Sequence, residues 1–472
     1  MRRTAHRGGA GDRLRRWLAA VAGLVLAVVA ITLALLGSLS STSSHDAQFD
    51  AGAPVLTAPR AAHPGRPPSR PAARKLSLHA RRPPATQAEV HLQAALSRAM
   101  RQAGPDTGAL VYDLNDNAEL YALRPAVPRP PASVEKLWTT VAVMRRLGPG
   151  TRLHTALLGA GHQHGGVWDG DLYLRGGGDP TFGDQAFNHY WNHGAGPTAN
   201  QLVAQLRAHG IRRVTGRVYA DESLFDRRRG GLETNFGADV PDFGGQLSAL
   251  TYDHGTTLPR YSPATFAAHE LVLTMRGSGI TAHASSHDRA TPPGAHMLAT
   301  VSSPPLSVMT RLMDVPSDDL YAELFAKQLG VLFGRGGNIP AGAQVIAQTI
   351  AGSYGLHPVI HDGSGLSRDD RSSPLQIVEL LHELWGTTTG RELAASLPTV
   401  GREGTVIGIG AKTPAAGNCI AKTGTLNYVT NLAGYCHRKG GHALAFALFV
   451  DGPPNGSADV LESRMIAAIA RY

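Results

Sequence analysis

Cysteine is scarce in this chain, with only Cys419 and Cys436 in 472 residues. Two thiols are too few for a disulfide-rich scaffold or a four-cysteine zinc site. The 21 histidines include no H-E-x-x-H motif. His189 and His193 have the four-residue spacing of one helix face, but they lack an intervening Glu and an evident third ligand. No metal and no other cofactor is therefore expected.

Acidic residues are rare in the first 86 positions. That stretch holds 13 of the 45 Lys and Arg residues but only 3 of the 36 Asp and Glu residues. The formal charge of +9 therefore belongs to the N-terminal stretch, and the remainder is almost neutral. A basic tail on a neutral body is weak support for nucleic-acid binding. We expect no nucleic-acid partner.

One long uncharged apolar run occupies residues 17–36 and follows six arginines. Twenty helical residues span roughly 30 Å, the thickness of a bilayer core. The pattern predicts an uncleaved signal-anchor within residues 1–41, with the N-terminus in the cytoplasm and the rest of the chain outside it. Cleavage within the small residues 37–44, which would release a secreted protein, is the alternative. Residues 42–87 are rich in Pro, Ala and Arg and are expected to form an extended linker.

From residue 88 onward the pattern is that of a globular protein. Helical periodicity predicts helices at 89–102 and 458–470. Five strand-like runs lie near the two ends of this part: 108–113, 119–123, 419–426, 429–436 and 443–450. Strands from both ends, with helices between them, predict an α+β fold with one antiparallel five-stranded sheet.

The middle of the chain, residues 157–299, has a different pattern. Short strand-like runs at 171–174, 217–220 and 270–275 are broken by Gly and His, and helical periodicity is scarce. We expect a β-rich inserted region. The main domain would then consist of residues 88–156 and 300–472.

The two cysteines flank a predicted hairpin whose two-residue turn is Asn427-Tyr428. In that register they face each other on a non-hydrogen-bonded pair, where a Cα separation of ~4.5 Å lies within disulfide range. A Cys419–Cys436 disulfide is predicted. Two free buried thiols are the alternative.

Ser133 and Lys136 form an S-x-x-K motif that follows Pro130-Pro131 at the start of a predicted helix. Three residues apart, they share one helix face, so that the amine can approach the hydroxyl. A partly buried lysine at this position can serve as a general base, and the helix dipole favours a developing alkoxide. Ser133 is the candidate nucleophile. An N-capping serine beside a surface lysine is the alternative.

Two further motifs follow. Lys422-Thr423-Gly424-Thr425 falls on a predicted strand, where a cation and hydroxyls suit a substrate carboxylate and a glycine allows close approach of the substrate backbone. Ser317-Asp318-Asp319 begins a predicted helix, and taken alone it is best interpreted as an N-cap.

In this order the three motifs resemble S-x-x-K, S-x-N and K-T-G of the serine penicillin-binding and β-lactamase superfamily. The distance of 181 positions from Lys136 to Ser317 is long. In this the chain resembles the low-molecular-mass class C penicillin-binding proteins (peptidase S13, or penicillin-binding protein 4, family). Those proteins insert extra domains between the first two motifs. Further segments similar to that family are 170–181, 221–225, 362–367 and 401–405.

The resemblance implies a penicillin-binding fold and a serine D-alanyl-D-alanine carboxypeptidase that acts on peptidoglycan stem peptides. Endopeptidase activity on cross-linked peptides is a second expectation, and β-lactams would be covalent inhibitors. Ser133 would attack the carbonyl of the penultimate D-Ala, Lys136 would take its proton, and Ser317 would pass a proton to the leaving D-Ala.

The resemblance also assigns the substrate contacts. Lys422 and Thr423 would hold the terminal carboxylate, with Gly424 beside the substrate backbone. The backbone N–H groups of Ser133 and Thr425 would form the oxyanion hole. Asp221, from the inserted part, would lie near the diamino-acid side chain of the substrate.

One position departs from the family, because Asp319 stands where the third residue of S-x-N is Asn. An ionised Asp only accepts hydrogen bonds, whereas an Asn amide also donates. A negative charge near Lys136 would also keep the proton on the amine and slow the base. We expect acylation by penicillin with slow turnover. A weakly or non-hydrolytic peptidoglycan-binding or β-lactam-sensing module is the alternative function, and a β-lactamase is disfavoured by the long insertion and the absence of E-x-x-L-N.

Overall fold

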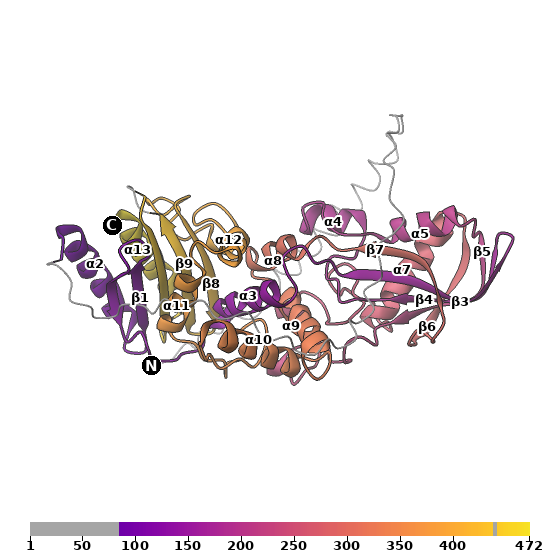
Figure 1. The fold of residues 1–472 in the computed structure, drawn as a ribbon, viewed down its shortest axis with the longest axis horizontal. Coiled ribbons are helices and arrows are strands. Elements are labelled where there is room, and N and C mark those ends of the chain that lie inside the picture. The colour runs from indigo at the N-terminus through magenta and orange to yellow at the C-terminus, as the bar shows by residue number, and fades with distance from the viewer. Residues whose placement is uncertain (1–84, 438–440) are drawn as a thin grey trace, which may run out of the picture. The chain divides into compact units, whose positions relative to one another are not determined.

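The computed structural model describes residues 85–437 and 441–472 (Figure 1). The expected signal-anchor at 17–36 and nearly all of the linker at 42–87 lie outside the described residues. In the part that is described, no helix combines the length and the apolar character needed to cross a bilayer.

The first sheet joins the two ends of the described chain, as expected. Its order is β2-β1-β10-β9-β8, and all four pairings are antiparallel. The strands are β1 (Gly108–Asp113), β2 (Ala118–Leu123), β8 (Cys419–Leu426), β9 (Val429–His437) and β10 (Ala443–Asp451). The predicted antiparallel five-stranded sheet is confirmed.

Helices cover both faces of this sheet, which explains why β1, β9 and β10 are almost entirely buried. Along β1, Leu110 and Tyr112 enter the core that contains α11 (Pro374–Leu384), whereas Ala109 and Val111 enter the core that contains α2 and α13. Helices α2 (Gln87–Ala103) and α13 (Asn455–Arg471) lie where helices were predicted, and they pack against each other. The period-two alternation of strand side chains thus sends successive residues to opposite layers.

The β8–β9 hairpin has the expected register. Leu426 pairs with Val429 across the two-residue turn, and Tyr428 adopts a positive φ of 64°. Cys419 lies opposite Cys436 in this register. The Cys419 N–H donates to the Ala415 carbonyl and the Cys419 carbonyl accepts from the Val400 N–H, so neither group bonds to Cys436. The pair is therefore non-hydrogen-bonded, and the two cysteines form a buried disulfide.

The core that contains α11 also includes residues from a group of further helices in the main domain. The group contains α3 (Lys136–Arg146), α8 (Leu306–Asp314), α9 (Asp319–Phe333), α10 (Ile339–Tyr354) and α12 (Thr388–Ser396). Trp138 of α3 is fully buried in this core, and its indole N–H donates to Ser372 Oγ at 3.0 Å. Two short 3-10 helices, η2 (Ala132–Glu135) and η4 (Gly404–Val406), approach β8.

The inserted region has its own five-stranded sheet of order β6-β5-β4-β3-β7. Unlike the first sheet it is mixed, because β4 pairs with β5 and β5 with β6 in parallel. Its strands are β3 (His154–His164), β4 (Val167–Arg175), β5 (Arg213–Asp221), β6 (Thr281–Asp288) and β7 (His296–Ser302).

Helices also belong to this region, and the expected scarcity of helix was wrong. It contains α4 (Gln185–Trp191), α5 (Ala199–Ala208), α6 (Val240–Phe243) and α7 (Pro263–Gly277). The expected strand at 270–275 lies within α7. Its start signals were present in the sequence, because Ser262 caps the helix and Pro263 stands at the first helical position.

Candidate active site

Ser133 lies in the η2 turn, directly before α3. The turn is held by β9, because the Asn431 side-chain amide donates to the carbonyl oxygens of Pro130 and Pro131 at 2.9 Å each. It is also in close contact with β8. A Cβ added to Gly424 would lie 2.4 Å from the Pro131 carbonyl oxygen and 3.1 Å from the Ser133 nitrogen. Gly424 therefore allows the nucleophile turn itself to approach the strand, which is a nearer reason for glycine than the approach of a substrate.

Lys136 is fully buried, and its ammonium group has three hydrogen-bond partners. Nζ donates to Ser133 Oγ at 3.0 Å, to Asp319 Oδ1 at 2.5 Å and to the Ser364 carbonyl oxygen at 2.8 Å. Burial raises the pKa of Asp319, and the positive charge of Lys136 opposes that rise. The spacing of the S-x-x-K motif thus brings the amine to the hydroxyl, and Asp319 makes an ion pair with the same amine.

The Ser364 carbonyl is oriented by two buried acids that sequence reasoning did not single out. Glu323 Oε1 accepts from the Ser364 N–H at 2.8 Å, and Asp362 Oδ1 accepts from the Gly365 N–H at 2.6 Å. The loop that both acids hold is the 362–367 segment. The sequence indicates that this segment resembles the family, but it does not indicate that the segment supports Lys136.

The three residues of the motif Ser317-Asp318-Asp319 make three different contacts. Asp318 is the N-cap of α9, because its Oδ1 accepts from the Tyr321 N–H at 3.0 Å. Ser317 is therefore not the cap. It has a positive φ of 66°, uncommon for a residue with a side chain, and its Oγ accepts from Lys422 Nζ at 2.7 Å. The turn before α9 thus places Ser317 in contact with Lys422 of β8 and Asp319 in contact with Lys136.

Lys422 on β8 is fully buried and donates to Ser317 Oγ and to the Thr423 carbonyl oxygen. Burial, followed by the positive charge of Lys136, lowers the pKa of Lys422 to about 7. Thr423 Oγ1 bonds to Thr405 Oγ1 of η4 at 2.7 Å. Thr405 belongs to the 401–405 segment, but its contact with the strand motif could not be known before the fold.

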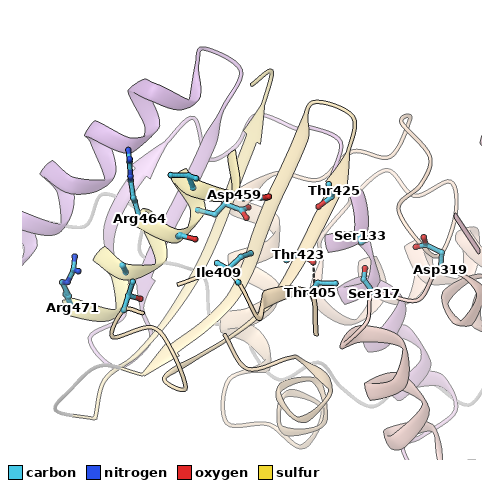
Figure 2. Close-up of a pocket in the computed structure, with 16 residues that line it drawn as sticks. Ser133, Ser317, Asp319, Thr405, Ile409, Thr423, Thr425, Asp459, Arg464 and Arg471 are labelled. Carbon is cyan, nitrogen blue, oxygen red and sulfur yellow. Dashed lines mark hydrogen bonds between the residues drawn. The ribbon is translucent and has the colours of Figure 1, made fainter. Parts of the chain in front are cut away.

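These groups meet at one cavity of about 860 Å³, whose wall includes Ser133, Ser317, Asp319, Thr423 and Thr425. Figure 2 shows Ser133 and Asp319 on one side of this set, with Thr423 and Thr405 between them and α13. The arrangement provides a hydroxyl next to a lysine amine, a second hydroxyl next to a second lysine, and the backbone at the start of a helix. Such a set can perform acyl transfer through a serine ester.

Asp221 is not in the wall of this cavity. It ends β5 in the inserted region, where its carboxylate accepts from the Ser223 and Thr291 side chains at 2.6 Å each. Burial alone would raise the pKa of Asp221, but these hydrogen bonds outweigh it and lower the pKa. The carboxylate connects loops of the inserted region in the described structure.

Sequence comparison identifies a family and relatives of this chain. A family model described as the D-Ala-D-Ala carboxypeptidase 3 (S13) family matches residues 90–265 and 256–471. Carboxypeptidase DacB of Mycolicibacterium smegmatis is 31% identical over 465 residues and 93% of each chain. A D-alanyl-D-alanine carboxypeptidase of an Actinomadura species is 25% identical, with 78% of this chain and 82% of that protein covered.

The fold is also found among solved structures. The crystal structure of penicillin binding protein 4 from Haemophilus influenzae is similar with a TM-score of 0.67 and 20% identity. The match covers 80% of this chain and 99% of that one. The α+β architecture with five-stranded sheets is therefore shared with that protein.

Proposed function

We propose that Ser133 is the nucleophile of this chain, which belongs to the D-Ala-D-Ala carboxypeptidase 3 (S13) family. Through Ser133 the chain acts as a serine carboxypeptidase on peptidoglycan stem peptides. One observation carries the proposal. Ser133 Oγ lies 3.0 Å from Lys136 Nζ, at the edge of β8 and in the wall of a cavity large enough for a peptide. The motif order and this geometry support the same assignment independently.

In the first step, Ser133 Oγ attacks the carbonyl carbon of the penultimate D-Ala, and Lys136 takes the hydroxyl proton. The amine must first lose its third proton to solvent, and the ion pair with Asp319 opposes this loss because the carboxylate charge stabilises the ammonium form of Lys136. The oxyanion receives hydrogen bonds from the backbone N–H groups of Ser133 and Thr425. An Asn carries no charge that keeps the proton on Lys136, so Asp319 slows this step relative to Asn without preventing it.

In the second step, the amide C–N bond breaks and D-Ala leaves as its amine. Ser317, which is hydrogen-bonded to Lys422, passes the proton to that nitrogen. Lys422 and Thr423 hold the carboxylate of the leaving D-Ala, and Gly424 lets β8 lie close to both the turn and the peptide. Water then hydrolyses the ester on Ser133. A β-lactam would acylate Ser133 by the same attack. The structure of the Haemophilus influenzae protein in complex with a β-lactam supports this expectation.

We further propose that the chain is held at the cell membrane by residues 17–36, with the catalytic domain on the extracytoplasmic side. The apolar run and its six preceding arginines support this placement. The Cys419–Cys436 disulfide supports it as well, because such bonds persist in oxidising compartments. Protease treatment of intact cells or spheroplasts is the test, and protection of the catalytic domain would refute the placement.

The function is tested by the release of free D-Ala from a stem pentapeptide. The wild-type protein should release it and Ser133→Ala should not. Asp319 favours a second candidate, a binding or β-lactam-sensing module, because it withholds the amine from its role as a base. That module would be labelled by penicillin but would release no D-Ala.

A further inference from the structure

The two faces of the second sheet carry different side chains. Leu172 of β4 and Val218 of β5 belong to the apolar core that also contains residues of α5 and α7. Tyr173 and Tyr219 are the next residues on the same two strands, and they pair with each other. Because successive strand side chains point to opposite faces, the two tyrosines lie on the face away from these helices.

An arginine completes a stack on this second face. The rings of Tyr173 and Tyr219 are stacked with their centroids 5.5 Å apart, and the Arg289 guanidinium carbon lies 4.3 Å from the centroid of the Tyr219 ring. The Arg289 side chain is exposed. A guanidinium that stacks on an aromatic ring keeps the N–H groups of its edge for an oxyanion. The stack thus places an exposed cation at a defined position.

The end of β5 fixes the position of Arg289. The Arg289 N–H donates to the Ala220 carbonyl oxygen at 2.8 Å. Two residues further on, the Thr291 N–H and hydroxyl both donate to Asp221 Oδ2, at 2.8 and 2.6 Å. The buried Asp221 carboxylate, which the family resemblance places near the substrate, therefore holds the loop that carries Arg289.

Arg289 and Tyr219 line a second cavity, of about 370 Å³, which lies within the range of small-ligand sites. Its wall also includes Arg217, Ser285, Ser286, His287 and Asp288. Arg217 precedes Tyr219 by two positions on β5, so that both side chains lie on the same face of the sheet. Two guanidinium groups, two hydroxyls and an imidazole thus meet at one small cavity.

The two arginines of this wall have no acidic partner. Among the residues that the structure describes, Arg217 and Arg289 make no ion pair, whereas Asp288 is paired with Arg227. Asp171 adds a negative charge beside the cavity, since its Oδ1 accepts from the Arg217 N–H at 2.8 Å. Three arginines therefore face two aspartates, and the positive charge that remains suits a singly charged oxyanion.

We propose that this cavity of the inserted region binds a free carboxylate of a peptidoglycan stem peptide, separately from the peptide that reacts at Ser133. Arg217 and Arg289 bind the carboxylate by charged hydrogen bonds. A peptide offers carboxylates and no phosphate, and each release of D-Ala leaves a new carboxylate on a stem peptide. The cavity therefore retains the protein on peptidoglycan that it has already processed. The inference rests on the proposed function, which supplies both the polymer and its carboxylates.

Two substitutions remove the charge from the cavity, Arg217→Gln and Arg289→Gln. Both side chains are exposed, so the fold should be retained, and thermal melting checks this. Arg213→Gln is the matched control. Arg213 lies on the same strand and the same face, is also exposed, and does not belong to the cavity wall.

The measurement is calorimetry with the product, a stem tetrapeptide, on protein acylated by penicillin, whose acyl group blocks the site at Ser133. The dissociation constant should rise roughly tenfold in Arg217→Gln and in Arg289→Gln, because each loses a charged hydrogen bond, and should stay within about twofold in Arg213→Gln. The tetrapeptide with its carboxylates converted to amides should bind the wild type roughly tenfold more weakly.

Three results of the calorimetry would overturn the site. The first is equal binding of the amide, and the second is unchanged affinity in both cavity variants. The third is tighter binding of inorganic phosphate than of the tetrapeptide to the wild type, which would assign the cavity to a phosphate-bearing polymer instead.

A second readout separates this inference from the proposed function. With insoluble peptidoglycan as substrate, the KM for D-Ala release should rise roughly fivefold in Arg289→Gln, while kcat/KM for a soluble pentapeptide stays within about twofold of the wild type. An unchanged KM on the polymer, or an equal loss on both substrates, would contradict the inference. Failure of the proposed function would appear differently, as a wild-type protein that releases D-Ala from neither substrate.

Discussion

Two serine–lysine pairs lie at the same cavity, whose wall includes both serines, and they have nearly the same geometry. Lys136 Nζ is 3.0 Å from Ser133 Oγ, and Lys422 Nζ is 2.7 Å from Ser317 Oγ. Both lysine side chains are fully buried. Distances alone therefore do not tell which serine is the nucleophile.

The pairs differ in their surroundings. Lys136 makes an ion pair with Asp319, whereas Lys422 has no carboxylate in direct contact among the described residues, and its pKa falls to about 7. By charge alone, Ser317 would have the better base. The backbone decides otherwise, because Ser133 occupies the turn at the start of α3 beside the β8 backbone, where N–H groups can stabilise an oxyanion. From this difference we infer that the oxyanion geometry, rather than the basicity of the lysine, selects the nucleophile.

The largest expected effect is the loss of the base. Lys136→Met should slow acylation by penicillin about 10³-fold, because general base catalysis contributes roughly 10²–10⁴-fold. Lys422→Met should slow it only about tenfold, through a lost charged hydrogen bond to the ligand carboxylate. Stopped-flow labelling measures both, with thermal melting to check folding. A greater loss in Lys422→Met would reverse the assignment of the two pairs.

Removal of the charge that distinguishes the pairs should have the next largest effect. Asp319→Asn should speed acylation about tenfold, which corresponds to ~1.4 kcal/mol in the barrier. The reason is that no carboxylate charge then keeps the third proton on the Lys136 amine. Asp318→Asn is the matched control, since Asn can still cap α9 and the residue does not contact Lys136. An unchanged or lower rate in Asp319→Asn would contradict the role given to this charge.

The lowered pKa of Lys422 predicts a pH dependence of substrate binding. Below about pH 7 the amine is charged and holds the peptide carboxylate, and above it the charge is lost. The dissociation constant of a pentapeptide for Ser133→Ala, which binds without acylation, should rise on the order of tenfold between pH 7 and pH 8.5. Calorimetry checks this, and affinity that is constant over the range would argue against a charged Lys422 as the carboxylate site.

The smallest effect concerns Asp318, the acid next to Asp319. Its Oδ2 lies 2.6 Å from His254 Nε2, and although burial alone would lower the pKa of His254, the charge and hydrogen bond of Asp318 raise it. A raised histidine pKa adds stability below about pH 6.5 that is lost as the pH rises through the higher folded value. Asp318→Asn should lower the free energy of unfolding by about 1 kcal/mol at pH 5.5 and by less at pH 8.5. Denaturant melts at the two pH values measure it; an equal loss at both would exclude the histidine.

Local patterns in the sequence predicted local geometry well. The three-residue spacing of Ser133 and Lys136 and the register of the Cys419 and Cys436 hairpin depend only on neighbours in the chain, and both are found in the structure. The apolar run at 270–275 predicts a strand, but it lies in the helix Pro263–Gly277, whose start is marked in the sequence by Ser262 and Pro263.

Contacts between distant segments could not be predicted in the same way. The pairing of Lys136 with Asp319 joins residues 183 positions apart, and the Thr423–Thr405 bond depends on where η4 meets β8. Glu462 lies in the predicted helix at 458–470, and only the fold shows that it is buried and belongs to the cavity wall. Asp221, assigned from the family resemblance, has its carboxylate bonded within the inserted region.

The most direct test of the central claim is the site of acylation. The protein is treated with penicillin, digested, and the adduct located by mass spectrometry in the wild type, Ser133→Ala and Ser317→Ala. We predict one adduct on Ser133 in the wild type and in Ser317→Ala, formed more slowly in the latter, and none in Ser133→Ala. An adduct on Ser317, or one that persists in Ser133→Ala, would contradict the account.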